Sequence, residues 1–220
     1  MWGVISLIVD KGKVLIEGMD LSGKTTIVDC LRHMMQVKYV QSRTLIENNY
    51  IHDFAVQQSK AGNLPRQLIS ELYKLAIMED LCKYEMSEGK FVLQDSYFAL
   101  RSYAYEKDYG SSKIANEIQD YLQMFPKPEV TFYLTASMNE RVKRNEKRNK
   151  KMAYMEKLLI TEPKKFEKIE QNLMNVTMQL FETEIINTEG KSPLEIAQYI
   201  KDRIKIIKKN DYSCVRERIY

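Results

Sequence analysis

Cysteine is scarce in this chain of 220 residues, which holds only Cys30, Cys82 and Cys214. Their number is odd and their spacing is wide. They therefore match neither a disulfide scaffold nor the close cluster of a metal site. The simplest setting for such a chain is a reducing compartment, and we expect a cytoplasmic protein.

Long apolar runs are also missing. The longest, such as residues 7–9, fall far short of the roughly 20 residues that span a bilayer. No basic stretch followed by a long apolar segment opens the sequence, so we expect no secretory signal. The net charge of +4 is mild, and no basic stripe with stacking aromatic residues is visible. We therefore expect neither a membrane nor a nucleic acid as a partner.

The length suits a single domain, residues 1–220, with at most a small lid. Short β-branched runs alternate with longer segments of helical periodicity. The short runs are 13–16, 37–40, 91–93, 130–134 and 185–186; the helical segments are 24–35, 64–89, 114–125, 164–181 and 193–207. This alternation predicts a three-layer α/β/α fold, with helices on both faces of a parallel sheet of about five strands. Residues 1–12 predict an extra hairpin strand ahead of the first strand.

The stretch Gly18-x-x-x-x-Gly23-Lys24-Thr25 is the pattern of a phosphate-binding loop. Glycine lets the backbone curl around phosphate oxygens, which the amide groups and the positive end of the next helix attract. Lys24 would reach the β- and γ-phosphates, and the Thr25 hydroxyl would bind magnesium. We predict that ATP and Mg²⁺ bind here. The predicted nucleotide-binding residues of the loop are Gly18, Ser22, Gly23, Lys24, Thr25 and Thr26.

Two downstream features fit phosphoryl transfer. Residues 91–95 read as an apolar strand ending in Asp95, a predicted magnesium ligand or substrate contact; a helix N-cap is the alternative. The basic run 141–151 places Arg141, Arg144 and Arg148 at helical spacing. We predict a lid at about 141–158 whose cations close over ATP. A solvated helix face is the alternative reading of this run.

Together these residues resemble the thymidylate kinase family. Its loop reads Phe-Glu-Gly-x-Asp/Glu-x-x-Gly-Lys-Thr/Ser-Thr, and residues 16–26 here read IEGMDLSGKTT. In that family the acidic residue, here Asp20, contacts the sugar 3′-hydroxyl of the bound nucleoside monophosphate. Residues 94–97 with 104–105 resemble the family's second motif, and residues 129–134 its Pro-Asp-x-Thr-x-Tyr-Leu strand. Arg144 and Arg148 resemble its Arg-x-x-x-Arg, in which the first arginine packs on adenine.

The resemblance also implies where the catalytic cation lies. Some family members carry an arginine just after the loop acid and few cations in the lid, while others show the reverse. Here Leu21 follows the acid and the lid region is basic. The resemblance therefore implies the second type, with Lys24, Asp95 and Arg148 as catalytic residues. Because family members are usually dimers, it further implies a homodimer.

The acceptor side departs from the family pattern. Ser96 replaces the arginine that contacts the acceptor phosphate, and residues 43–48 replace the family's Arg-Glu-Pro-Gly-Gly-Thr loop. The candidate substrate-binding residues, besides Asp20, are the cations Arg43, Lys74 and Arg101 and the aromatic residues Tyr97 and Tyr105. Each cation could equally be a surface residue with its apolar stem against the fold.

We predict an ATP-dependent nucleoside monophosphate kinase, with dTMP or a related pyrimidine nucleotide as the leading acceptor. One alternative is a deoxynucleoside kinase, in which Asp95 would be the base that a poorly nucleophilic sugar hydroxyl needs. The other is a degenerate nucleotide-binding protein without turnover, which the loss of arginine at Ser96 suggests.

Overall fold

The computed structural model describes residues 12–85, 90–148, 152 and 154–216, with residues 209–216 described by their backbone alone. Five strands form one parallel sheet in the order β2-β3-β1-β4-β5. Their bounds are β1 (Gly12–Glu17), β2 (Tyr39–Arg43), β3 (Phe91–Tyr97), β4 (Val130–Thr135) and β5 (Thr183–Asn187). The predicted α/β fold with about five parallel strands is confirmed.

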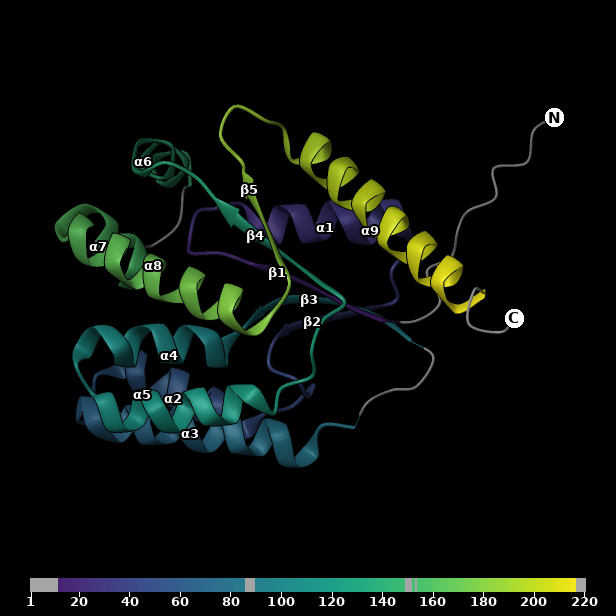
Figure 1. Ribbon diagram of the computed structural model, residues 1–220. Helices are drawn as coiled ribbons and strands as arrows, with labels where there is room; N and C mark the ends of the chain where they lie inside the picture. Colours follow the sequence, from purple (N-terminus) through teal and green to yellow (C-terminus); the bar gives the residue numbers. More distant parts are fainter. Residues whose placement is uncertain (1–11, 86–89, 149–151, 153, 217–220) are drawn as a thin grey trace.

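Helices cover both faces of this sheet (Figure 1). They are α1 (Lys24–Met35), α2 (Tyr50–Ala61), α3 (Arg66–Lys83), α4 (Phe98–Tyr109), α5 (Ser112–Gln123), α6 (Met138–Glu146), α7 (Tyr154–Thr161), α8 (Pro163–Leu180) and α9 (Pro193–Arg216). Side chains alternate along β1: Val14 and Ile16 pack with α1 and α9, whereas Leu15 packs with α3, α4, α5, α7 and α8. Both faces are therefore buried, as a parallel sheet requires. None of the described helices is long and apolar enough to cross a membrane.

Local chemistry explains several element boundaries. Helix α5 buries Ile114, Ile118 and Leu122 along one stripe, the spacing expected of a helix that covers a core. Helix α2 begins after Asn49, whose side chain accepts a hydrogen bond from the His52 amide at 2.8 Å.

The structure corrects two predicted boundaries. Strand β2 begins at Tyr39, two residues later than predicted, because Val37 still belongs to the end of α1: its amide donates to the Arg32 carbonyl at 3.0 Å. Helix α3 ends at Lys83 rather than near residue 89, which lies outside the described residues. The predicted hairpin strand also lies outside them.

The carboxyl ends of the parallel strands meet at one edge of the sheet. The loop after β1, the end of β2 at Arg43 and the end of β3 at Asp95 and Ser96 all lie there. This is the edge at which open α/β sheets bind their ligands.

Candidate active site

The phosphate-binding loop connects β1 to α1, the context that the sequence predicts. Gly18 has a φ of 142°, and a Cβ there would collide with the Leu134 carbonyl oxygen of β4. Gly23 caps the start of α1 with a φ of 94°. Backbone conformation thus requires glycine at both positions, which leaves the loop free to curl around an anion.

The lysine of the loop is held over the loop backbone. The Lys24 amine donates to the Met19 carbonyl oxygen at 3.0 Å. Burial, helped by the nearby Arg101 guanidinium, lowers the pKa of Lys24 to about 8. Ser22 is fully buried, while Thr25 and Thr26 are exposed at the first turn of α1. The amine is therefore placed where a bound phosphate group could replace its carbonyl partner.

Thr25 and Asp95 come together across 70 residues of sequence: the Thr25 hydroxyl lies 3.4 Å from an Asp95 carboxylate oxygen. Because β3 continues to Tyr97, Asp95 lies within the strand, and the alternative of a helix N-cap is wrong. Magnesium takes oxygen ligands and uses few from the protein, so this hydroxyl and carboxylate fit it. In the described part of the chain, no group of three or more His, Cys, Asp or Glu residues could hold a metal by itself.

A partly buried ionic cluster lies beside the loop. Arg101 of α4 donates to an Asp20 carboxylate oxygen and to the Gly18 carbonyl oxygen, each at 2.7 Å, and to the Ser96 hydroxyl at 3.2 Å. Burial alone would raise the pKa of Asp20, but the charges of Arg101 and Lys24 outweigh it and hold that pKa at about 2. Asp20 is therefore ionised and already paired.

Glu17 forms the base of this ionic cluster. It is fully buried, and its carboxylate accepts hydrogen bonds from the Ser96 hydroxyl at 2.7 Å and from the Tyr97 amide at 3.0 Å. Arg101 lies 3.8 Å from the same carboxylate. We did not predict a role for Glu17. Its position between an apolar strand and Gly18 was the available signal.

Backbone strain gathers around the same edge of the sheet. Among the described non-glycine residues, four have positive φ, and three of them follow or end neighbouring strands: Leu21 (65°), Arg43 (68°) and Ser96 (65°). The register between β2 and β3 shifts at Ser96: Ser42 pairs with Asp95, and Arg43 pairs with Tyr97. Such conformations are costly for residues with a Cβ and often occur at functional sites.

Of the other predicted acceptor residues, two lie near the ionic cluster and one does not. Arg43 is exposed, and its charge acts on Asp20; burial, with the nearby Asp20 charge, raises the pKa of Tyr105. These two thus lie near the cluster. Lys74 instead pairs with Glu71 and Glu117 on α3 and α5, each at 2.6 Å, and is not brought to it.

The prediction that Tyr97 is a substrate-binding residue is wrong. Its side chain is 0% exposed and packs edge-on against Phe125 and Phe181 in the core. The register between β2 and β3 skips Ser96, whose φ is 65°, so the strand alternation is broken there and Tyr97 packs on the same face of the sheet as Leu15. Tyr97 is therefore part of the hydrophobic core and not of the ligand-binding surface.

Helix α6 lies on the other side of the loop, above a pocket of about 360 Å³. Arg144 is fixed there by Glu140 at 2.9 Å and by the Leu21 carbonyl oxygen at 3.0 Å. Arg148 also lines the pocket but is half-exposed and paired with Glu156 at 2.8 Å. Other lining residues include Gly23, Thr26, Lys147, Thr188 and Lys191. Residues from the loop and the basic run thus meet around one cavity.

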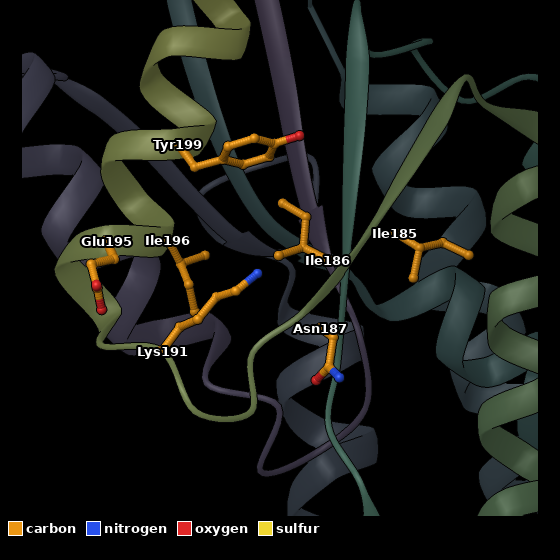
Figure 2. Close-up of a pocket in the computed structure, with 7 residues that line it drawn as sticks. All are labelled: Ile185, Ile186, Asn187, Lys191, Glu195, Ile196 and Tyr199. Atoms are coloured by element: carbon orange, nitrogen blue, oxygen red, sulfur yellow. The ribbon is translucent and has the colours of Figure 1, made fainter.

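A second pocket, of about 350 Å³, lies between the edge strand β5 and the start of α9. Figure 2 shows Ile186 and Tyr199 turned toward it, with Ile185 on the opposite side of the strand. Lys191 and Ile196 line both pockets. The loop between β5 and α9 therefore borders the pocket beside Arg144 as well. We did not predict that this loop takes part in the site.

A parallel sheet with a glycine loop at its carboxyl edge and a lysine folded over that loop defines a P-loop nucleotide-binding protein. The sequence profile of a family described as thymidylate kinase matches residues 16–200. The chain belongs to the thymidylate kinase family and is an ATP-dependent phosphotransferase, so the predicted resemblance is confirmed. This assignment supports a nucleoside monophosphate kinase.

Solved structures agree on the fold. Thymidylate kinase from Candida albicans is 19% identical over 90% of this chain and 93% of its own, with a TM-score of 0.66. Deoxyadenosine kinase from M. mycoides with bound dCTP is 17% identical over 87% of this chain and 99% of its own, with a TM-score of 0.54. A search of curated protein sequences finds no match.

Proposed function

We propose that the chain transfers the γ-phosphoryl group of ATP to a (deoxy)nucleoside monophosphate, with dTMP or a related pyrimidine nucleotide as the leading acceptor. The observation that carries the proposal is the cluster in which Lys24 and Arg101 flank Asp20 beside the loop. A monophosphate is mostly dianionic near neutral pH, because its second pKa is about 6. Transfer to it therefore needs cations and alignment more than a general base.

On this proposal, the ATP triphosphate follows residues 18–25 and its adenosine occupies the pocket beside Arg144. Thr25 and Asp95 would hold Mg²⁺, which neutralises charge on the phosphate oxygens when it is bound. The lid, at about residues 141–158, would supply Arg148 to the transferred group. To do so, Arg148 has to exchange its ion pair with Glu156 for the phosphate.

One observation favours a deoxynucleoside kinase as a second candidate. Ser96, where the family has its phosphate-binding arginine, gives its hydroxyl to the buried Glu17 rather than to a ligand. An acceptor without a phosphate would need no arginine there. The sugar hydroxyl would then need a base, for which Asp95 of β3 is the candidate.

A substrate panel tests the proposal. The purified protein, with ATP and Mg²⁺, is offered each nucleoside and each monophosphate, and ADP release is measured. We expect turnover with monophosphates, led by dTMP. Turnover with nucleosides alone would establish the second candidate instead. Binding of ATP without ADP release from any acceptor would show a nucleotide-binding protein that has lost catalysis.

We also propose a cytoplasmic homodimer. Apolar side chains on the adjoining helices α2 and α3 are exposed, among them Tyr50 (72%), Phe54 (47%) and Leu75 (45%). Contiguous exposed apolar surface favours a partner. Cys82 is a free, exposed thiol, which suits a reducing compartment. Light scattering over a range of concentrations checks the dimer, and a monomer throughout would contradict it.

A further inference from the structure

Three successive carbonyl groups of the phosphate loop accept hydrogen bonds from side chains outside the loop. The contacts join Arg141 to the Asp20 oxygen (2.6 Å), Arg144 to the Leu21 oxygen (3.0 Å) and Thr188 to the Ser22 oxygen (3.1 Å). The two arginines come from α6, and Thr188 follows β5. The outer side of the loop is thus bound at three consecutive residues.

A planar trans peptide directs its N–H opposite to its carbonyl. A carbonyl held toward α6 or Thr188 therefore turns the following N–H away from them. For the Ser22 carbonyl, this is the amide of Gly23, just ahead of Lys24. A phosphate loop binds its ligand through amides turned inward in this way.

We propose that Arg141 and Thr188 are positioning residues, which hold the loop amides of Leu21 and Gly23 toward bound phosphate; the Ser22 amide between them donates to the Met19 carbonyl oxygen at 3.3 Å. Neither Arg141 nor Thr188 belongs to the loop pattern, and neither side chain needs to touch the nucleotide's phosphates. This inference rests on the proposed function only in requiring that the loop bind a nucleotide's phosphates.

Thr188 has the geometry for this role. It is 2% exposed, and its hydroxyl receives a hydrogen bond from Arg144 at 3.0 Å. The hydroxyl's one proton can go to the Ser22 oxygen or to the Thr135 oxygen, which lies 3.0 Å away. The Thr135 oxygen already accepts from the Thr188 amide at 2.9 Å, which favours the Ser22 oxygen. Thr188 thus connects the loop, the lid helix and the end of β4.

Arg141 is fixed even more firmly. It is fully buried, it pairs with Glu170 of α8, and it donates to the Ala136 carbonyl oxygen at 2.9 Å. Its guanidinium lies over the Phe166 ring, 5.3 Å from the centroid. A buried charge with this many partners occupies a single position. The Asp20 carbonyl that it holds is therefore fixed to α8 as well as to α6.

The test removes the Thr188 hydroxyl without changing the shape of the side chain. Binding of ADP and of inorganic tripolyphosphate, each with Mg²⁺, is measured by calorimetry for wild type, Thr188→Val and Thr188→Ser. We expect Thr188→Val to weaken both ligands about tenfold, the effect of about one lost hydrogen bond to a buried group. Thr188→Ser keeps the hydroxyl and restores most of the affinity.

Thr177→Val is the matched control. Thr177 is also fully buried, and its hydroxyl donates to the Leu173 carbonyl oxygen at 2.7 Å within α8, away from the loop. Thr177→Val should lower the midpoint of thermal unfolding much as Thr188→Val does. It should leave the binding of ADP and of tripolyphosphate unchanged. If Thr188→Val does not fold, Thr188→Ala replaces it in the same comparison.

The outcomes are distinct. Equal binding by wild type and Thr188→Val would overturn the proposal. Weaker ADP binding with unchanged tripolyphosphate binding would also overturn it, because Thr188 would then act through Arg144 on the adenine base and not on the phosphates. A wild-type chain that binds neither ligand would instead overturn the proposed function, and this inference with it.

Discussion

The donor side and the acceptor side of this site differ in how freely their residues can change. On the donor side Gly18 and Gly23 have backbone angles that other residues avoid, and Lys24 and Thr25 follow at fixed offsets. On the acceptor side the family's arginine is Ser96, while Arg101, just over one helical turn later, reaches the Ser96 hydroxyl. Loop amides bind phosphate only when the backbone adopts one conformation. An arginine side chain is long, so an arginine at a neighbouring sequence position can place its guanidinium at the same point in the site.

The strongest test of the donor side is Lys24→Ala. It removes the cation next to the transferred phosphoryl group, so we expect kcat to fall by about three orders of magnitude. The fold should persist, because the Lys24 amine has a single backbone partner in the loop. ADP release and circular dichroism measure the two effects. Lys60→Ala, on exposed α2, is the control. Surviving activity would show that the loop assignment is wrong.

Arg148→Ala tests whether the lid supplies a catalytic cation. We expect kcat to fall by about two orders of magnitude, with little change in ATP affinity, because a transition-state cation acts mainly on the moving phosphoryl group. Lys143→Ala removes an exposed cation from α6 as the control. Near-normal turnover would return Arg148 to a surface role in its pair with Glu156.

The same asymmetry explains what the sequence could predict. The loop, the strand that carries Asp95 and the start of the basic helix were predictable, because glycine offsets and 3.6-residue periodicity are local signals. The strand continues to Tyr97, and α6 ends at Glu146, before Arg148. Helix α2 was missed although Asn49 marks its start, because it buries only His52 and Ala55.

The pairing of Arg101 with Asp20 was not predictable, since it joins residues 81 apart through the fold. Thr188 likewise meets the loop across 166 residues. Tyr97 was misplaced because the register shift at Ser96, which depends on pairing with β2, turns its side chain into the core. Local patterns thus located the donor side, whereas the acceptor side depends on contacts between distant segments.

Asp20→Asn measures how firmly the acceptor-side cluster is held. The pKa of Asp20 is about 2 in the folded chain against an ordinary 3.8, so its ionised form stabilises the fold. That contribution, about 2 kcal/mol, is present above about pH 4 and is lost as pH falls toward 2. Urea unfolding should give wild type a larger free energy of unfolding than Asp20→Asn at pH 7. The difference between the two should narrow below pH 4. Exposed Asp29→Asn is the control. A gap independent of pH would contradict the charge pairing.

Arg43→Ala should have the smallest effect and separates the two sides most cleanly. Arg43 is exposed at the end of β2, and its charge acts on Asp20, His52 and Tyr73, none of which lines the pocket beside Arg144. We expect the KM for the monophosphate to rise about tenfold with the KM for ATP unchanged, as for one lost charged hydrogen bond. Arg43→Lys keeps the charge and should recover part of the loss, while Arg32→Ala on α1 controls for net charge. If both KM values rise together, Arg43 supports the whole site, and the acceptor cation must be Arg101 alone.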